Sequence, residues 1–238
     1  RQMCIRDSIH YPHLVDYVVR LSPDGKEMER VSLFQAFLDS KFANMLRRKT
    51  SPSWPKSSWE RMHTNSVMKL EADMAPHFPM FKKGQMLISL RNMNAIAVLD
   101  MAEKKIVWAK RDSWLGQHAA RFLKDGNILM FDNRGQESLR GRKSRILVFD
   151  PVKNQVKWSF SGAGRTVMDS VIYGRVEVLK NGNMLAVESL SGRLWEVTPD
   201  GKVAWKYMYK GKSRWASIIS AIRYSPEELP FLQEVASK

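Results

Sequence analysis

Short apolar segments alternate with polar turns along most of the chain, and two turn phrases recur between them. In the first phrase, lysine, glycine and asparagine or glutamine precede an apolar strand, as in KKGQMLIS (82–89), LKDGNILM (123–130) and LKNGNMLA (179–186). In the second phrase, a turn and an apolar position precede tryptophan, as in MAEKKIVWA (101–109), PVKNQVKWS (151–159) and PDGKVAWKY (199–207). The tryptophans recur at intervals of about 50 residues, which is typical of an array of supersecondary units. Short strands with glycine-containing turns favour β-repeats over helical repeats.

The same pattern predicts where the strands lie. We expect strands over Met86–Leu90, Ala95–Leu99, Ile106–Lys110, Ala119–Leu123, Ile128–Phe131, Arg145–Asp150, Val156–Phe160, Gly174–Leu179, Met184–Glu188, Arg193–Thr198 and Val203–Tyr207. Another strand is expected directly after His63. Because four strands make one propeller blade, residues 60–210 correspond to about three blades. The predicted fold class is therefore all-β, a β-propeller, in which the repeated tryptophans fill the space between blades.

Different patterns precede this array. The segment VDYVVRLSPDGKEMERVSL (15–33) has two apolar runs around a Ser-Pro-Asp-Gly turn and is similar to WEVTPDGKVAW (195–205), which predicts one more strand-turn-strand unit. The array then amounts to about four blades. The apolar spacing in SLFQAFLDSKFANMLRR (32–48) predicts an amphipathic helix, and TSPSWPKSSW (50–59) predicts a Ser/Pro loop. Helix and loop form one insertion at 32–59.

The two ends of the chain have patterns of their own. SPEELPFLQEVASK (225–238) predicts a short helix, with Ser225 as its N-cap and Glu228 three residues further on. Residues 1–8, RQMCIRDS, fit none of the later patterns, and no initiator methionine opens the chain. We therefore expect residues 1–8 to be a non-native leader, the chain to be a fragment, and 9–238 to form a single partial propeller domain.

Composition limits the class of protein. The chain has 238 residues, of which 44% are hydrophobic, as in ordinary globular proteins that bury a sizeable core. No apolar run approaches the roughly 18 residues of a membrane-spanning helix, so we expect no membrane span in this chain. The only cysteine is Cys4, which excludes an intrachain disulfide. The oligomeric state is not predicted.

The charge is strongly basic. With 39 Lys and Arg against 24 Asp and Glu, the formal net charge is +15, which favours anionic partners. Many of the lysines lie in turns, where they are solvated. The basic cluster of Arg140, Arg142 and Lys143 has no interleaved aromatic residues, so we expect no nucleic-acid partner.

Polar side chains interrupt the apolar pattern at the ends of predicted strands, and these are the candidates for function. They are His63, Arg91, His118, Asn133, Arg145 and Arg193. Taken singly, each has a structural explanation, such as a histidine that ties a loop or an arginine paired with a glutamate. In a propeller, equivalent strand ends converge on the central channel. Two histidines and several arginines there suit a substrate with a tetrahedral oxyanion, because arginine binds its oxygens and neutral imidazole can act as base or nucleophile.

Other chemistries fit the sequence poorly. The histidines have no matching carboxylate pattern, and only His10 and His13 have a ligand-like spacing, so we expect no metal site. The chain contains no P-loop, dinucleotide fingerprint or G-x-S-x-G motif, and we expect no cofactor.

Five phrases occur in a consistent order over residues 59–210. They are HTNSV (63–67), LISLRNMNAIAVLD (87–100), QHAARFLKDGNILMFDNRG (117–135), SRILVFDP (144–151) and LKNGNMLAVESLSGRLWEVTPDGKVAWKY (179–207). Together they resemble the bacterial arylsulfotransferase family. The resemblance implies a six-bladed β-propeller in the full-length protein, of which about four blades lie in this chain. It also implies transfer of a sulfuryl group from a phenolic sulfate ester to another phenol, without a nucleotide donor.

The resemblance further implies a ping-pong mechanism in the central channel, in which a histidine attacks sulfur and an acceptor phenol resolves the sulfohistidine. The catalytic positions that match the family's motifs are His118, His63 and Arg145. Arg91, Asn133 and Arg193 are added from their placement, as substrate-binding residues. The implied partners are an aryl sulfate donor and a phenolic acceptor. The implied location is the periplasm, or export more generally.

The chain departs from the family at one position. Members place a further histidine, their nucleophile, on a blade after the Ser-Arg phrase, whereas no histidine follows His118 here. MDSVIYGRVEVL (168–179) offers Ser170, Tyr173 and Arg175 instead. Either His118 or His63 is then the nucleophile, or the chain performs different chemistry, or it only binds.

The alternatives belong to other functional classes. The first is a non-catalytic propeller that binds an anionic ligand or a partner protein, since a fold does not determine function. A quinone-cofactor propeller would require an acidic metal site, which the sequence lacks.

Overall fold

The computed structural model describes residues 14–47, 60–134, 143–209, 217–225, 227–229 and 231. These residues form three four-stranded sheets and two two-stranded hairpins. The predicted leader 1–8 and the predicted Ser/Pro loop 50–59 lie outside the described residues.

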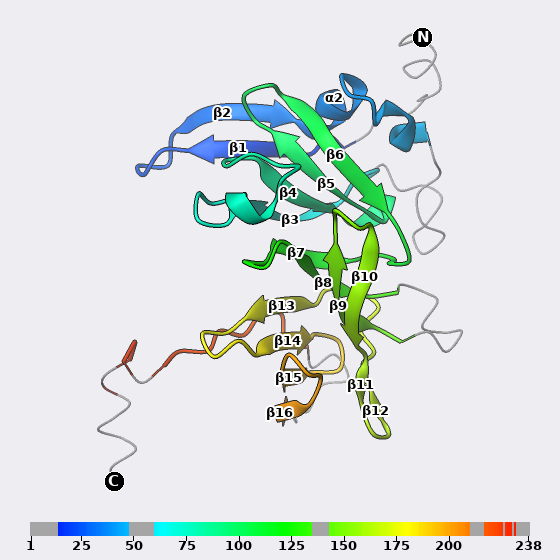
Figure 1. The fold of residues 1–238 in the computed structure, drawn as a ribbon, viewed down its shortest axis with the longest axis vertical. Coiled ribbons are helices and arrows are strands. Elements are labelled where there is room, and N and C mark those ends of the chain that lie inside the picture. Colours follow the sequence, from blue (N-terminus) through cyan, green and yellow to red (C-terminus); the bar gives the residue numbers. More distant parts are fainter. Residues whose placement is uncertain are drawn as a thin grey trace.

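Each four-stranded sheet is an antiparallel meander whose strands pair in chain order. The first blade contains β3 (Thr64–Lys69), β4 (Met86–Leu90), β5 (Ala95–Asp100) and β6 (Lys105–Arg111). The second contains β7 (His118–Phe122), β8 (Ile128–Asp132), β9 (Arg145–Asp150) and β10 (Gln155–Phe160). The third contains β13 (Arg175–Val178), β14 (Met184–Glu188), β15 (Arg193–Val197) and β16 (Val203–Met208). The blades follow one another from top to bottom of Figure 1. The predicted all-β propeller fold is confirmed.

The strand predictions are confirmed, because well-defined turns fix where the strands begin and end. Each predicted strand is present with its bounds shifted by at most one residue at either end, and β3 is the strand expected after His63. In the Lys-X-Gly-Asn turns, the backbone N–H of Leu123 donates to the carbonyl of Asn127 at 2.9 Å, and that of Leu179 to Asn183 at 2.7 Å. Their glycines have positive φ, which glycine adopts without strain. The small hairpin of β11 (Gly162–Ala163) and β12 (Thr166–Val167) was not predicted.

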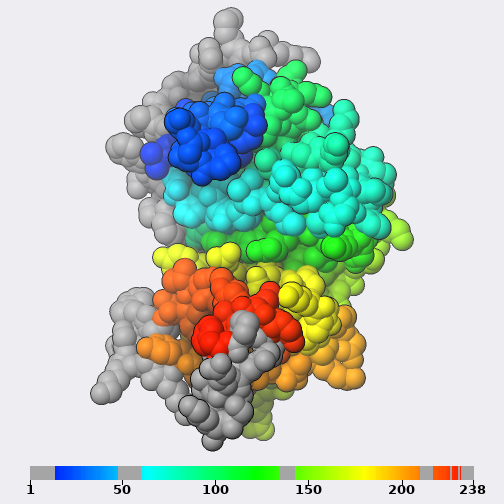
Figure 2. All heavy atoms as spheres, turned by 90° about the vertical axis from the view of Figure 1, so that its left-hand side faces the viewer, coloured from blue at the N-terminus to red at the C-terminus, as the bar shows by residue number. Residues whose placement is uncertain are grey.

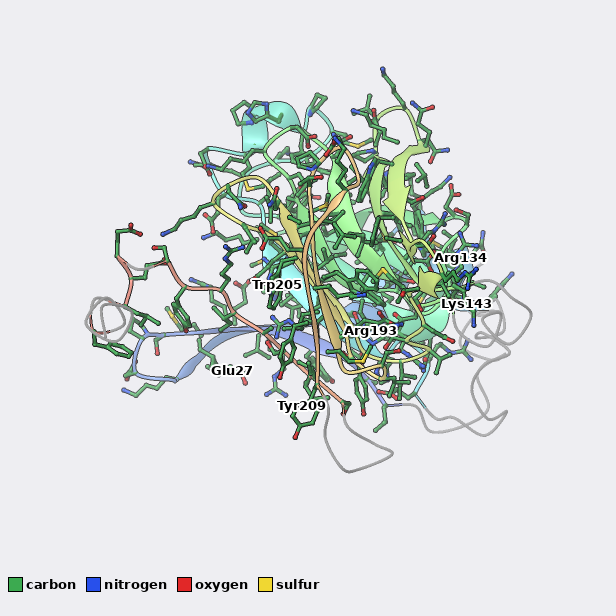
Figure 3. The ribbon with its side chains drawn as sticks, turned by 90° about the horizontal axis from the view of Figure 1, so that it is seen from below. Glu27, Arg134, Lys143, Arg193, Trp205 and Tyr209 are labelled. Atoms are coloured by element: carbon green, nitrogen blue, oxygen red, sulfur yellow. The ribbon has the colours of Figure 1, made fainter. Side chains whose placement is uncertain are left out.

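Three apolar clusters hold these sheets together: one between the N-terminal elements and the first blade, and one between each pair of successive blades. Trp108 lies edge-on to Phe81 at 5.5 Å in the second cluster, and Trp158 packs against the third. Trp205 is 46% exposed on β16 (Figure 3), where no described sheet follows. The prediction that the tryptophans pack between blades is therefore confirmed for Trp108 and Trp158 and wrong for Trp205.

The N-terminal part is a half blade in the described residues. The predicted hairpin is present as β1 (Tyr17–Leu21) and β2 (Glu27–Ser32), and only these two strands form its sheet. Its turn repeats the one in the third blade: Ser22 N donates to Lys26 O at 2.9 Å, as Thr198 N does to Lys202 O at 2.8 Å.

The prediction of a single helix over 32–48 was wrong, because the structure has two separate helical segments in this range. α2 (Leu33–Leu38) ends with Asp39 as its C-cap, and a separate 3-10 helix, η1 (Ala43–Arg47), follows. Ser40 lies between them, and its hydroxyl donates to the carbonyl of Phe37 at 2.9 Å. Short polar side chains of this kind compete with backbone hydrogen bonds, which explains the break.

The described C-terminal residues 217–225 lie against the third blade (red against yellow and orange in Figure 2), where Arg223 forms an ion pair with Glu196. The backbone N–H of Ser225 donates to the Glu228 carboxylate at 2.7 Å, which is half of the predicted capping box. Most of the predicted helix lies outside the described residues. Within the described ranges, no helix has the length and apolarity needed to span a membrane.

Candidate functional site

The first strands of all three blades line one cavity of about 360 Å³. The described residues around it come from β3, β7, the start of β13 and the C-terminal segment: Asn65, Ser66, Val67, Met68, His118, Ala119, Ala120, Arg121, Tyr173, Gly174, Arg175 and Ile219. The first strands of successive blades therefore converge on a shared space. Of the six candidate residues, His118 alone belongs to this lining.

His118 is held by two hydrogen-bond acceptors. Its Nδ1 lies 2.9 Å from the carbonyl oxygen of Gly116 and 2.7 Å from Oδ1 of Asn133. The amide nitrogen of Asn133 donates to the carbonyls of Ser170, at 2.6 Å, and Tyr173, at 2.5 Å, so its oxygen is the atom that faces the imidazole. Because both partners of Nδ1 accept, Nδ1 carries the proton and Nε2 carries the lone pair. Among the described residues, Nε2 has no hydrogen-bond partner.

The surroundings keep this imidazole neutral. The pKa of His118 is lowered from 6.5 to about 4, mainly by burial and to a smaller extent by the nearby Arg91 and His63. The hydrogen bonds to Asn133 and Gly116 act in the opposite direction, but burial outweighs them. At neutral pH the ring therefore presents a free lone pair on Nε2.

A second polar group from the first blade lies beside His118. His63 Nδ1 lies 2.8 Å from the carboxylate of Glu60. The Arg91 side chain is buried, which lowers its pKa, while the nearby Glu60 and the Tyr173 phenol raise it. Arg91 and His63 also act on the pKa of His118. The side chains of His63, Arg91 and His118 therefore form one electrostatic cluster, together with the nearby Glu60 and Tyr173.

The backbone is strained where the chain enters the cavity. His63, Ala119 and Tyr173 have φ values of 51°, 54° and 59°, each at the start of the first strand of a blade. Left-handed backbone at non-glycine residues costs on the order of 1–3 kcal/mol, and such strain is concentrated at functional sites.

Arg145 and Arg193 lie elsewhere, at equivalent positions of the second and third blades. Arg145 Nε donates to the buried carboxylate of Asp132 at 2.9 Å, and Arg193 Nε to the buried carboxylate of Glu188 at 2.8 Å. In each blade the carboxylate belongs to the last residue of the second strand and the arginine to the first residue of the third. Each carboxylate also accepts a backbone N–H from the preceding loop, that of Leu115 or Asp169.

The sequence analysis missed one basic residue of the lining, Arg121, and mentioned Arg175 only as standing where a histidine was sought. Strict alternation would put His118 and Arg121 on opposite faces of β7. The register of β7 shifts between them, in the stretch that contains the left-handed Ala119, and both residues line the cavity. The sequence alone offered no signal for Arg121, because its place in the lining depends on this shift of register.

Fold and cavity together define a β-propeller with a basic, histidine-containing site on the first strands of its blades. The sequence profile of the family described as Arylsulfotransferase (ASST) matches residues 12–210. The chain belongs to this family.

Comparison with other known proteins adds little beyond this. No curated protein matches the chain in sequence. A protein of unknown function from Bacteroides caccae is 16% identical, with a TM-score of 0.48, and the match covers 82% of this chain and 55% of that one. A streptogramin B lyase is 11% identical, with a TM-score of 0.46, over 82% of this chain and 49% of that one. The WD40 β-propeller domain of Doa1 is 10% identical, with a TM-score of 0.45, and the match covers 65% of this chain and 42% of that one. The chain thus spans about half the length of the solved structures that it matches.

Proposed function

We propose that this chain carries the sulfuryl-transfer site of an arylsulfotransferase, and that His118 is its nucleophile. The observation that supports this most strongly is the state of the imidazole: Nδ1 donates to two acceptors, and burial keeps the ring neutral. Nε2 is then a nucleophile at the wall of a basic cavity. The site on this chain therefore offers a nucleophile in His118.

Arg121 and Arg175 would bind the sulfuryl oxygens of the donor. Both line the cavity with His118, and neither forms an ion pair with a carboxylate among the described residues. The guanidinium group matches the geometry of sulfuryl oxygens and stays charged at any relevant pH. Arg91 adds positive potential from the first blade.

In the first half-reaction, Nε2 of His118 attacks sulfur, the N–S bond forms, and the S–O bond to the aryl group breaks. The aryl oxygen leaves with the electron pair and takes up a proton. In the second half-reaction, the oxygen of an acceptor phenol attacks the same sulfur and loses its proton, and the electron pair of the N–S bond returns to Nε2. Such covalent catalysis gives ping-pong kinetics.

The other candidate residues have supporting roles in this proposal. Asn133 holds His118 in the reactive tautomer by accepting from Nδ1. Arg145 and Arg193 fix the loops that enter the site through their buried carboxylates, rather than contacting the substrate. The proposed substrates are an aryl sulfate donor and a phenolic acceptor. Export to the periplasm is proposed from the family.

The test measures phenol-dependent release of nitrophenolate from p-nitrophenyl sulfate. The wild-type protein and an Arg145→Lys variant should transfer, whereas His118→Ala and His118→Gln should lose at least about a thousandfold in kcat. Thermal unfolding of each variant separates loss of chemistry from loss of fold.

The opposite result would favour the non-catalytic alternative. If folded wild-type protein releases no nitrophenolate but binds the ester in a manner that depends on Arg121 and Arg175, the cavity is a binding site for anions. Transfer that survives in both His118 variants would move the nucleophile to His63.

A further inference from the structure

The C-terminal segment, residues 217–225, is bound to the third blade near both of its ends. The backbone N–H of Ile218 donates to the carbonyl of Ser189 at 3.1 Å. Towards the other end, the guanidinium group of Arg223 forms an ion pair with Glu196, a buried residue of β15. The segment therefore has a defined place against the blade (Figure 2).

This place matches that of the first strand of a following blade. Ser189 comes directly after the last residue of β14, as Asn133 comes directly after the last residue of β8. The side chain of Asn133 donates to the carbonyl of Tyr173, just before β13, at 2.5 Å. In both cases, the residue after the second strand of a blade binds the segment that comes after that blade.

The turn after the C-terminal segment supports the same correspondence. The backbone N–H of Glu228 donates to the carbonyl of Ser225 at 3.0 Å. After β7, the backbone N–H of Gly126 donates to the carbonyl of Leu123 at 3.2 Å, across the same spacing. The segment thus has both the blade contact and the turn of a first strand, and the first strands line the cavity.

The C-terminal segment does reach the cavity. Ile219 lines it together with residues of β3, β7 and β13. The next residue, Ser220, accepts a hydrogen bond from Nη1 of Arg175 at 3.3 Å, and Arg175 also lines the cavity. The segment is therefore a fourth wall of the site, which brings an isoleucine close to a guanidinium group.

An apolar and a cationic side chain on one side of the cavity suit the two parts of an aryl sulfate. Arg175 is the proposed ligand of the sulfuryl oxygens, and a single ester oxygen joins the sulfur to the ring. The ring must then lie close to the sulfuryl-binding group, where Ile219 offers it an apolar surface. Contact between ring and isoleucine removes apolar area from water, which is favourable. An anion without a ring gains nothing from Ile219.

We propose that Ile219 determines the preference of the site for aryl esters, by packing against the ring of the bound ester. For the class of ligand, this inference rests on the proposed function. Ile219 takes no part in the bond changes at sulfur, so its contribution is a binding contribution. It can be measured on ligands that do not transfer.

Aryl sulfonates test this contact, because a C–S bond replaces the ester oxygen and they are not donors. Naphthalene-2-sulfonate carries a ring and methanesulfonate does not. We expect Ile219→Ala to weaken the binding of naphthalene-2-sulfonate by about 5- to 10-fold and that of methanesulfonate by less than about twofold, measured by NMR titration of the ligand. Ile219→Leu, which restores the apolar volume, should bind both sulfonates like the wild type.

Ile222→Ala is the matched control. Ile222 belongs to the same segment and is similarly exposed, at 65% against 57% for Ile219, but it is not among the described residues around the cavity. This variant should bind both sulfonates like the wild type. Thermal unfolding checks that each variant is folded.

Three results would overturn the inference: no loss of binding in Ile219→Ala, an equal loss for both sulfonates, or an equal loss in Ile222→Ala. A wild-type protein that does not bind naphthalene-2-sulfonate would overturn it as well. Failure of the proposed function gives a different result. The ring-dependent loss at Ile219 then persists, while the wild type transfers no sulfuryl group from 2-naphthyl sulfate to phenol.

Discussion

Arginine side chains occur in two regions of this molecule and have different surroundings in each. At the junction of the second and third strands, Arg145 and Arg193 face buried carboxylates and tie loops to their blades. On the first strands, Arg121 and Arg175 face a cavity that also contains His118. The residue type alone therefore does not distinguish an arginine that ties a loop to its blade from one that faces the cavity. The two kinds differ in whether a buried carboxylate lies against the guanidinium group.

Replacing an arginine at a strand junction should have the largest effect of the substitutions considered. Arg145→Met should destabilise the protein by about 3 kcal/mol, because it leaves the buried Asp132 without its closest cation. Denaturant unfolding measures the change in the free energy of unfolding. Arg193→Met should act in the same direction through Glu188, and Lys153→Met, on an exposed turn, is the control. A stable Arg145→Met protein without transfer activity would instead return Arg145 to the active site.

Replacing the arginines that line the cavity should affect the transfer kinetics rather than the stability of the fold. We expect Arg121→Met and Arg175→Met to lower kcat/KM for an aryl sulfate donor by about 10- to 100-fold each, since each removes a charge-assisted contact worth about 1.5–3 kcal/mol. The free energy of unfolding should change little, because neither arginine has a carboxylate partner among the described residues. Steady-state kinetics and denaturant unfolding on the same samples separate the two regions. Unfolding at lower denaturant with unchanged kinetics would contradict the assignment.

The pH dependence gives a smaller, graded effect. The pKa of His118 is lowered from 6.5 to about 4 in the folded protein, so between these values the unfolded chain binds the extra proton and the folded protein does not. This contribution to stability is therefore complete above about pH 6.5, falls as the pH drops towards 4, and amounts to about 3 kcal/mol over that window.

The pH dependence of the transfer activity should reflect the protonation of the same His118 imidazole. The kcat/KM for the donor should stay on a plateau down to about pH 5 and fall near pH 4, where the nucleophile becomes protonated. For stability, the slope between pH 6.5 and 4 should be reduced in His118→Gln relative to the wild type. An acid limb near pH 6.5 would mean that the buried imidazole titrates like an exposed one.

Much of the fold follows from local sequence. Lys-X-Gly-Asn turns fix the ends of the strands, and alternating apolar residues identify them, so Arg145–Asp150 and Met184–Glu188 have the predicted bounds. The prediction of one continuous helix over 32–48 was wrong because Ser40, near the middle of this range, forms a side-chain hydrogen bond to the backbone. The prediction that Trp205 packs between blades was wrong because the burial of this side chain depends on a neighbouring sheet rather than on its own strand.

The site was predicted less completely, since it depends on contacts between blades. The sequence identified His118, but its tautomer depends on Asn133, whose orientation is set by carbonyls of the following segment. Arg121 was hidden because the register of β7 shifts between His118 and this residue. The ion pair of Arg145 with Asp132 was not predicted, because only the pairing of β8 with β9 brings the two residues together.

The central claim is that Nε2 of His118 carries the sulfuryl group between donor and acceptor. The most direct measurement is rapid mixing with p-nitrophenyl sulfate in the absence of acceptor, followed by mass spectrometry of the protein and its peptides at neutral to alkaline pH. We expect one added sulfuryl group, on the peptide that contains His118, and its loss when phenol is added. A sulfuryl group on any other residue, or transfer without a covalent adduct, would contradict it.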